Sequence, residues 1–159
     1  MYKIIYLSLV FALFSFRTQP DLPNMSLKSI DGKTYNLKKD FAEKDKQYVF
    51  SFWATWCVPC IRELTEISEV YDDWKSKVNF EMIAVSVDDA RTKQKVSPLV
   101  NGKEWPYTVL LDTNHDLKRR LGIIDMPYII VVKNNKIVYS HSGYTPGDEI
   151  ELFEKMKTL

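Results

Sequence analysis

The sequence predicts an α/β fold in which a mixed central sheet is flanked by helices, with a β-hairpin as an N-terminal extension. The first observation is an apolar run over residues 48–53 that is followed directly by a stretch of helical periodicity. The second is a nearly unbroken apolar run over residues 80–87, typical of a central strand covered on both faces. The third is a pair of apolar runs separated by Asn134-Asn135 and followed by a last helix. The order is βαβ, then a further helix and strand, then ββα, as in a mixed sheet between helices.

The first half of the chain is expected to contain a hairpin and an amphipathic helix. Residues 26–37 predict the hairpin, with Asp31-Gly32 supplying the positive φ angles of its turn. The charged residues 38–47 predict a short helix or a loop. The helix that starts at Cys57 carries apolar residues at helical spacing, which predicts a buried stripe. The stripe consists of Ile61, Leu64, Ile67, Tyr71 and Trp74.

The middle of the chain is expected to add one helix and one strand to this arrangement. Asp88-Asp89 predict the cap of a helix that is broken by Pro98 and ends near Gly102. A strand is expected to follow over residues 107–111.

The last part of the chain is expected to consist of a short helix, a hairpin and a final helix. The short helix covers residues 115–121, and residues 128–132 and 137–140 pair as the hairpin. Thr145 is expected to cap the final helix, with Pro146 at its first position. The residues of that helix expected to face the core are Ile150, Phe153 and Met156.

The composition fits one globular domain and gives no sign of a nucleic-acid partner. The chain has 159 residues, of which 45% are hydrophobic and 27% charged, enough for a core of its own. The formal net charge is only +1, and no basic stripe with interleaved aromatic residues is present.

The N-terminal segment has the character of an export signal. Lys3 precedes residues 4–16, an uncharged apolar run of 13 residues, which is shorter than the ~20 residues of a membrane-spanning helix. The cleavage site is poor because Leu13-Phe14-Ser15 lacks an A-x-A pattern, so an uncleaved anchor and a buried N-terminal element stay open. We therefore expect residues 1–19 to be a signal peptide or membrane anchor, and residues 22–159 to be the folded domain.

The only two cysteines, Cys57 and Cys60, stand at the predicted junction between strand and helix. A thiolate at the N-terminus of a helix is favoured by free N–H groups and the helix dipole, and a second thiol one turn on lies within reach of it. A zinc site is disfavoured because it needs four ligands and no third cysteine exists. A purely structural disulfide is disfavoured because so short a loop removes little chain entropy. The pair therefore predicts thiol–disulfide exchange.

Four blocks of the sequence resemble the TlpA/ResA-like branch of the thioredoxin superfamily. They are residues 52–60 (FWATWCVPC), Val87-Asp88, Leu111-Asp112 and Met126-Pro127. The resemblance covers residues 22–159 and implies a thioredoxin-like fold and an extracytoplasmic thiol–disulfide oxidoreductase. It further implies a reductase of protein disulfides, with cytochrome c maturation as the process served in many members.

The resemblance assigns roles to individual residues. It implies that Cys57 is the exposed nucleophile and Cys60 the buried resolving cysteine. It implies that Glu63 is the acidic residue of the active site, since Ser51 stands where thioredoxin has a buried aspartate. It also implies that Pro127 is a cis-proline. The expected substrate-binding residues are Trp56, Pro59, Met126 and Pro127; Tyr128, where threonine is usual, departs from the family pattern.

Plainer assignments stay open for several of these residues. Glu63 suits a solvated helix position as well, and a trans bond before Pro127 is the ordinary state. His115 and His141 are expected at the surface.

Two strand-end carboxylates and one tryptophan are expected to be structural. Asp88 and Asp112 are expected to cap loops and not to bind a metal ion. Trp53 is expected in the core. No metal and no cofactor are expected.

Two other functions compete with the reductase interpretation. A peroxidase of the peroxiredoxin kind shares the fold, but it normally has a lone cysteine in a Pro-x-x-x-Thr-x-x-Cys context, and Thr55 stands only two residues before Cys57. A non-enzymatic binding module would use the surface of Trp56 and Pro127. The partners expected for the reductase are substrate protein disulfides and a membrane-embedded thiol reductant. The enzyme is expected to be a monomer, and an N-terminal membrane tether stays open.

Overall fold

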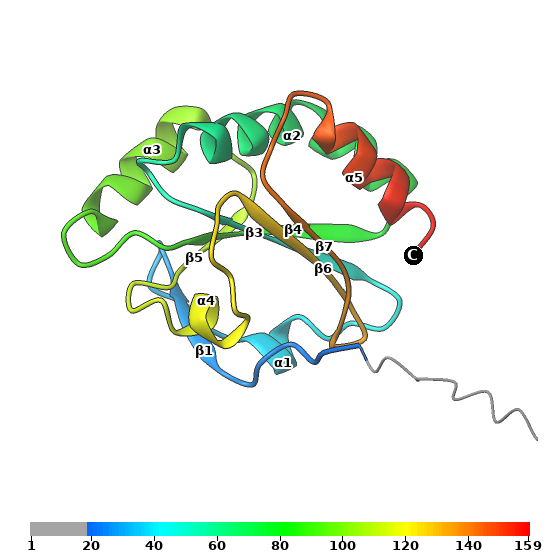
Figure 1. Cartoon of the computed structure of the whole chain (residues 1–159), viewed down its shortest axis with the longest axis horizontal. Coiled ribbons are helices and arrows are strands. Elements are labelled where there is room, and N and C mark those ends of the chain that lie inside the picture. The colour runs from blue at the N-terminus through cyan, green and yellow to red at the C-terminus, as the bar shows by residue number, and fades with distance from the viewer. Residues whose placement is uncertain (1–18) are drawn as a thin grey trace, which may run out of the picture.

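The computed structural model describes residues 19–159 and is built on one seven-stranded sheet (Figure 1). The strand order is β2-β1-β5-β4-β3-β6-β7. The strands are β1 (Ser26–Ser29), β2 (Thr34–Asn36), β3 (Gln47–Trp53), β4 (Phe80–Ser86), β5 (Thr108–Leu111), β6 (Tyr128–Lys133) and β7 (Lys136–Ser142).

The sheet is mixed, as the sequence predicted. Strands β3, β4 and β5 run parallel to one another, whereas β6 is antiparallel to β3. The hairpin of β6 and β7 extends one side of the sheet, and the hairpin of β1 and β2 extends the other through β5. Because β3 is paired on both sides and covered on both faces, all seven of its residues are buried.

Helices cover both faces of the sheet. Figure 1 shows α2, α3 and α5 along one face and α1 and α4 along the other. The helices are α1 (Leu37–Asp40), α2 (Val58–Lys77), α3 (Val96–Lys103), α4 (Asp116–Arg120) and α5 (Asp148–Met156), with a 3₁₀ turn (Lys93–Lys95) before α3. The predicted arrangement of a mixed sheet flanked by helices is confirmed.

The stripe predicted on α2 forms the centre of the core on its side of the sheet. Leu64, Ile67, Tyr71 and Trp74 are buried, and Ile61 is partly buried against them. This stripe also takes in Cys60 and Glu63, so the site residues lie on the face of the helix that packs on the sheet.

The turn between β1 and β2 differs in detail from the prediction. Only Gly32 has a positive φ (84°); Asp31 does not. The Ser29 N–H donates to the Lys33 carbonyl at 2.8 Å, and the Gly32 N–H to the Ser29 carbonyl at 3.0 Å. The connection is therefore a three-residue loop, which needs a left-handed residue at one position and not two.

The predicted helix after Asp88-Asp89 was placed too early. Helix α3 begins at Val96, and Pro98 lies in its first turn instead of breaking it. Proline is tolerated there because the first N–H groups of a helix have no partner within the helix. The prediction that this helix ends near Gly102 is confirmed.

The start and the buried face of the last helix also differ from the prediction. Helix α5 begins at Asp148, with Gly147 as its N-cap, and not at Pro146. Over residues 19–159 no helix N–H donates to the Thr145 hydroxyl, so this side chain does not cap the helix; its own N–H donates to the Asp148 carboxylate at 2.6 Å. Ile150 is 61% exposed, because the buried stripe is formed by Leu152, Phe153 and Met156.

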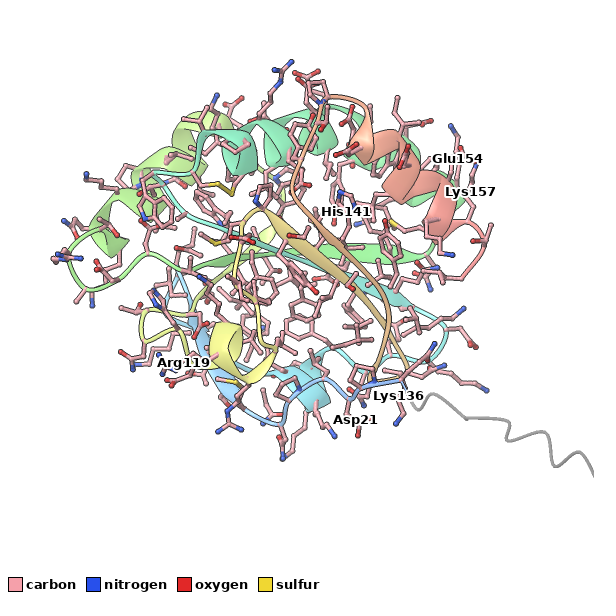
Figure 2. All side chains as sticks on the ribbon, in the orientation of Figure 1. Asp21, Arg119, Lys136, His141, Glu154 and Lys157 are labelled. Atoms are coloured by element: carbon pink, nitrogen blue, oxygen red, sulfur yellow. A yellow bond between two sulfur atoms is a disulfide. The ribbon has the colours of Figure 1, made fainter. Side chains whose placement is uncertain are left out.

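The chain enters the domain along the edge strand β7. The Leu22 side chain is fully buried, and its N–H donates to the Asn135 carbonyl at 2.9 Å. Asp21 accepts hydrogen bonds from Lys38 and Lys136. Figure 2 shows Asp21 and Lys136 close together at the surface. Of residues 1–19, which were predicted to be a signal peptide or membrane anchor, 1–18 lie outside the described residues. None of the helices formed by residues 19–159 combines the length and the apolar character needed to cross a membrane.

Replacing Phe153 by Ala should lower the free energy of unfolding by about 3–5 kcal/mol. Phe153 is buried and stacks on Trp74, with ring centroids 4.6 Å apart. Ile150→Ala, on the same helix, should change the free energy by less than about 0.5 kcal/mol because its side chain is exposed. Urea denaturation followed by circular dichroism measures both variants. Equal losses in the two would contradict the observed packing of α5.

Candidate active site

The two cysteines stand where β3 ends and α2 begins. Cys57 is the N-cap residue of α2, with an extended backbone (φ −93°, ψ 94°). Its N–H donates to the Ala54 carbonyl at 3.0 Å, and its carbonyl accepts the Ile61 N–H at 3.1 Å. Pro59 lies in the first turn, where its missing N–H costs nothing. The local sequence thus ends the strand, makes a tight turn and starts the helix at the first cysteine.

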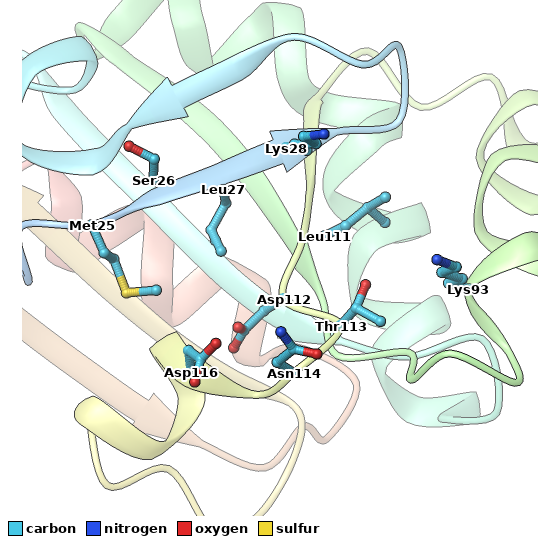
Figure 3. A pocket seen from close by; sticks show the side chains of 10 residues that line it. All are labelled: Met25, Ser26, Leu27, Lys28, Lys93, Leu111, Asp112, Thr113, Asn114 and Asp116. Atoms are coloured by element: carbon cyan, nitrogen blue, oxygen red, sulfur yellow. The ribbon is translucent and has the colours of Figure 1, made fainter.

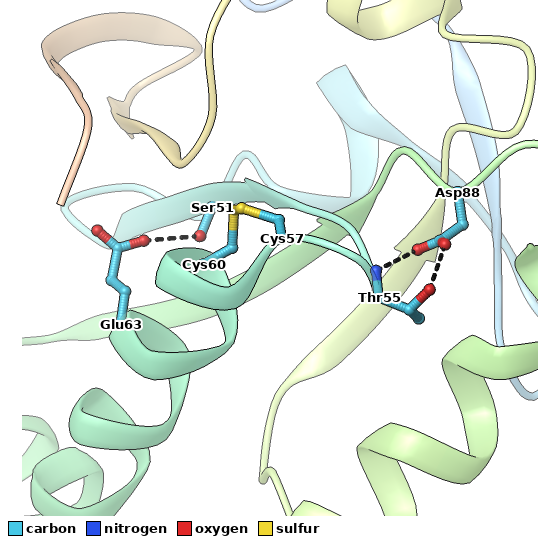
Figure 4. Close-up of a disulfide and its surroundings, with 6 residues drawn as sticks. All are labelled: Ser51, Thr55, Cys57, Cys60, Glu63 and Asp88. Carbon is cyan, nitrogen blue, oxygen red and sulfur yellow. Dashed lines mark hydrogen bonds between the residues drawn. A yellow bond between two sulfur atoms is a disulfide. The ribbon is translucent and has the colours of Figure 1, made fainter.

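Cys57 and Cys60 form a disulfide with their Cα atoms 5.3 Å apart (Figure 4). Cys57 is 7% exposed and Cys60 is completely buried. A substrate can therefore reach only Cys57, which also occupies the helix N-terminus where a thiolate is favoured. The predicted distinction between an accessible and a buried cysteine agrees with this geometry.

Glu63 is buried one turn after Cys60. Only 2% of the residue is exposed, and its Oε2 accepts a hydrogen bond from the Ser51 hydroxyl at 3.3 Å (Figure 4). Burial raises the pKa of the Glu63 carboxyl from 4.5 to about 8; the Ser51 hydrogen bond opposes this shift, while the charges of Asp148 and Glu149 add to it. In the disulfide form, the carboxyl group therefore holds its proton at neutral pH. The alternative in which Glu63 is a solvated helix residue is wrong.

The loop before β6 lies at the same end of the sheet as the disulfide. The Met126–Pro127 peptide bond is cis, so this prediction is confirmed. Tyr128 pairs with Phe52, one residue before β3 ends, which places Pro127 beside the turn that carries Cys57. The Pro127 carbonyl accepts the Gly143 N–H at 2.8 Å. Within residues 19–159, the N–H and carbonyl of Met126 make no hydrogen bond to the backbone, which leaves both available to a substrate strand.

Three exposed apolar side chains lie at or next to the turn that carries Cys57 and the loop before β6. Trp56 (62% exposed), as predicted, and Val58 flank Cys57 on either side along the chain. Ile124, two residues before Met126, is also exposed. Val58 and Ile124 were not predicted as contact residues, although their places beside a C-x-x-C pair and near a predicted cis-proline could have indicated them. Such exposed apolar groups suit contact with an extended peptide.

Asp88 does not cap a helix, so that prediction is wrong, but it does cap a loop, as was also predicted. It is fully buried, and its carboxylate accepts hydrogen bonds from the Thr55 N–H (2.9 Å) and the Thr55 hydroxyl (2.6 Å). Its partner is therefore the turn that carries the cysteines (Figure 4). Asp112 does cap, as expected: it accepts the N–H groups of Leu117 and Lys118 at the start of α4.

The two histidines are less exposed than the sequence suggested. A ring nitrogen of His115 lies 2.8 Å from the Val87 carbonyl, so the side chain is tied to the end of β4. The Nε2 of His141 is buried and lies 3.6 Å from the Asp148 carboxylate. Trp53 is fully buried, as predicted.

Two pockets lie away from the disulfide. A pocket of about 290 Å³ opens between β1, the end of β5 and α4 (Figure 3). It is lined by Met25, Ser26, Leu27, Lys28, Lys93, Leu111, Asp112, Thr113, Asn114 and Asp116. The second, of about 210 Å³, is lined in part by Tyr128 and Arg120. In the part of the chain that the structure describes, no three His, Cys, Asp or Glu side chains are grouped so as to hold a metal ion.

The fold and this site together define the class of protein. A mixed sheet flanked by helices, a C-x-x-C disulfide at a helix N-terminus and a neighbouring cis-proline are the features of a thioredoxin-like protein with a redox-active disulfide. The chain belongs to the AhpC/TSA family, whose model matches residues 19–141.

Individual relatives agree with this class. A thioredoxin-like protein from Porphyromonas gingivalis, known from its solution structure, is 46% identical with a TM-score of 0.76, over 89% of this chain and 93% of that one. The thiol-disulfide oxidoreductase ResA of Bacillus thuringiensis subsp. konkukian is 29% identical over 139 residues, which is 87% of this chain and 77% of ResA. A putative thiol:disulfide interchange protein DsbE from Chlorobium tepidum has the same fold, with a TM-score of 0.76 at 22% identity, over 89% of this chain and 96% of that one. The predicted resemblance to the TlpA/ResA-like branch is confirmed.

The disulfide form should lose stability as the pH rises from about 4.5 to about 8. Unfolded Glu63 releases its proton near 4.5, whereas the folded protein holds it up to a pKa of about 8. The contribution of Glu63 is therefore complete below pH 4.5 and is lost as the pH rises through 8, with a slope approaching about 1.4 kcal/mol per pH unit between these values.

Glu63→Gln should remove this contribution because the amide does not titrate. Urea denaturation between pH 4 and 9 measures it, with Glu69→Gln, exposed on the same helix, as the matched control. A Glu63→Gln profile parallel to that of the unaltered protein would contradict the burial of an ionisable group at this position.

Proposed function

We propose that this thiol–disulfide oxidoreductase works as a reductase of protein disulfides outside the cytoplasm. The observation that carries the proposed dithiol chemistry is the unequal environment of the two sulfur atoms. Cys57 is accessible at the N-terminus of α2, while Cys60 is buried on the same helix face as a carboxyl group with a raised pKa. One thiol is thereby suited to attack a substrate and the other to resolve the product.

The reaction begins with the reduced dithiol. The Cys57 thiolate attacks one sulfur of a substrate disulfide; an S–S bond forms between enzyme and substrate, and the other substrate sulfur leaves as a thiolate that takes a proton from water. Cys60 then attacks Cys57, which restores the internal disulfide seen here and releases the second substrate thiolate. The substrate gains two electrons, and the enzyme loses them.

Glu63 is proposed to accept the proton of Cys60 in the resolving step. The two residues lie three apart on α2, and residues at this spacing are neighbours on a helix surface. A carboxylate that accepts this proton ends protonated in the disulfide form, in agreement with its raised pKa of about 8. A base with a pKa near the working pH is well matched to such a transfer.

The substrate is proposed to bind as an extended strand beside Pro127. The unpaired N–H and carbonyl of Met126 would add a strand-like pair of hydrogen bonds, while Trp56 and Pro59 would contact its side chains. The electrons are proposed to come from a membrane-embedded thiol donor that reduces the disulfide again. Three parts of the proposal rest on the ResA-like resemblance alone. They are that the enzyme reduces its substrates, that it serves cytochrome c maturation and that it is a monomer.

The peroxidase alternative has less support from this site. Thr55 stands two residues before Cys57, and its hydroxyl donates to Asp88 at 2.6 Å. That hydroxyl is thereby engaged away from the sulfur atoms, whereas a peroxidatic site needs polar groups aimed at the peroxide.

Cysteine variants test the reaction with a disulfide-bonded protein such as insulin and a thiol reductant. Cys57→Ser should abolish turnover, and Cys60→Ser should accumulate a mixed disulfide that is visible on a non-reducing gel, because the resolving thiol is gone. Glu63→Gln should slow turnover on the order of 100-fold.

Activity that survives loss of both cysteines would point to a binding module, and faster oxidation by peroxide than by protein disulfides would point to a peroxidase. A measured potential close to that of a strong oxidant would reverse the proposed direction.

Export is proposed to depend on residues 4–16. An apolar run of this length would be a costly exposed patch on a cytosolic domain. Replacing Leu9 and Val10 by charged residues should keep the protein in the cytoplasm, whereas the apolar exchange Leu9→Ile with Val10→Leu should not. Cell fractionation with an antibody to the folded domain measures both. Unchanged localisation of the charged variant would contradict the export proposal but not the proposed redox chemistry.

A further inference from the structure

Asp88 is a buried carboxylate whose partners are all neutral. It follows β4 and is fully buried. Its oxygens accept hydrogen bonds from the Thr55 N–H at 2.9 Å, the Thr55 hydroxyl at 2.6 Å and the Ser86 hydroxyl at 2.9 Å. Among residues 19–159, no lysine, arginine or histidine forms an ion pair with it. Burying a carboxyl group is costly unless its oxygens are hydrogen-bonded, and these three donors supply those hydrogen bonds.

These hydrogen bonds connect the end of β4 to the turn that carries the dithiol. The Val87 N–H donates to the Trp53 carbonyl at 2.8 Å, and the next residue, Asp88, takes both donors of Thr55 (Figure 4). The chain is thus fixed to β4 up to two residues before Cys57. Beyond that point Trp56 is exposed, so packing of its side chain does not hold the turn.

We propose that Asp88 is a positioning residue of the dithiol: by binding both donors of Thr55, its carboxylate holds Cys57 at the N-terminus of α2. The inference rests on the proposed function, in which Cys57 is the attacking thiolate. The stabilisation that a helix terminus gives to an anion falls off within one turn. A turn released from β4 lets Cys57 move relative to the free N–H groups, and the thiolate then loses part of its stabilisation.

Thr55→Val tests the anchor while leaving the carboxylate in place. Valine has the shape of threonine without the hydroxyl donor, and Thr55→Ser, which keeps both donors, is the matched control. In the reduced protein, limiting iodoacetamide should modify Cys57 on the order of tenfold more slowly at pH 7 in Thr55→Val, and the midpoint of its pH profile should shift upward by about one unit. Thr55→Ser should stay within about twofold of the unaltered protein. A Thr55→Val protein that is less stable but has an unshifted midpoint would overturn the proposal, because a purely structural bond does not move it.

Asp88→Asn supplies an independent check through coupling. The amide oxygen can accept only part of what the carboxylate accepts, which raises the midpoint, whereas removing a negative charge near a thiolate lowers it. An upward shift, as in Thr55→Val, therefore reports the broken contact and not the lost charge, and a downward shift would contradict the positioning role. Because both changes break the same contact, the double variant should shift no further than the larger single one, whereas additive shifts would show that Asp88 does not act through Thr55. Alkylation reports on Cys57 whether or not the enzyme turns over. If the unaltered protein fails to reduce protein disulfides, the proposed function fails while these midpoints still decide the role of Asp88.

Discussion

The pairing of β3 with β4 on one side and with β6 on the other is the constraint on which the active site depends. Trp53 ends β3 opposite Ser86, and Phe52 lies opposite Tyr128, the first residue of β6. Cys57 follows the end of β3, Asp88 follows the end of β4, and Pro127 directly precedes β6. One set of backbone hydrogen bonds therefore brings three distant segments to the same end of the sheet. Because all of β3 is buried, its position leaves little freedom to the turn that follows.

Two buried carboxyl groups flank the dithiol, and their surroundings differ. Glu63 accepts one long hydrogen bond, from Ser51, and lies near the acidic start of α5, so its charged form is disfavoured. Asp88 accepts three hydrogen bonds, two of them from the turn itself. The first environment suits a group that gains and loses a proton, and the second suits a group that holds a segment in place.

In the proposed reaction, substrate contact and chemistry belong to different layers of the site. The exposed groups are apolar side chains and the unpaired backbone of Met126. Such groups would bind extended peptides of many sequences, because they make few contacts that depend on the peptide's side chains. The buried groups, Cys60 and Glu63, lie on the helix face that packs against the sheet. In the proposed mechanism, the mixed disulfide would therefore be resolved in a region from which water is largely excluded.

The sequence by itself determined the order of strands and helices, the junction between β3 and α2 and the pair of cysteines at it, because hydrophobic periodicity and turn residues act over a few neighbours. Local signals were less reliable at helix starts, as Val96 and Asp148 show, since several nearby residues can begin a helix and tertiary packing selects among them. Only the tertiary structure decided that Glu63 is buried, because its helix position lies at the edge of the apolar stripe. It alone brought Asp88 to Thr55, 33 residues away in the chain. That contact depends on the register of β3 against β4, which no local pattern in the sequence encodes.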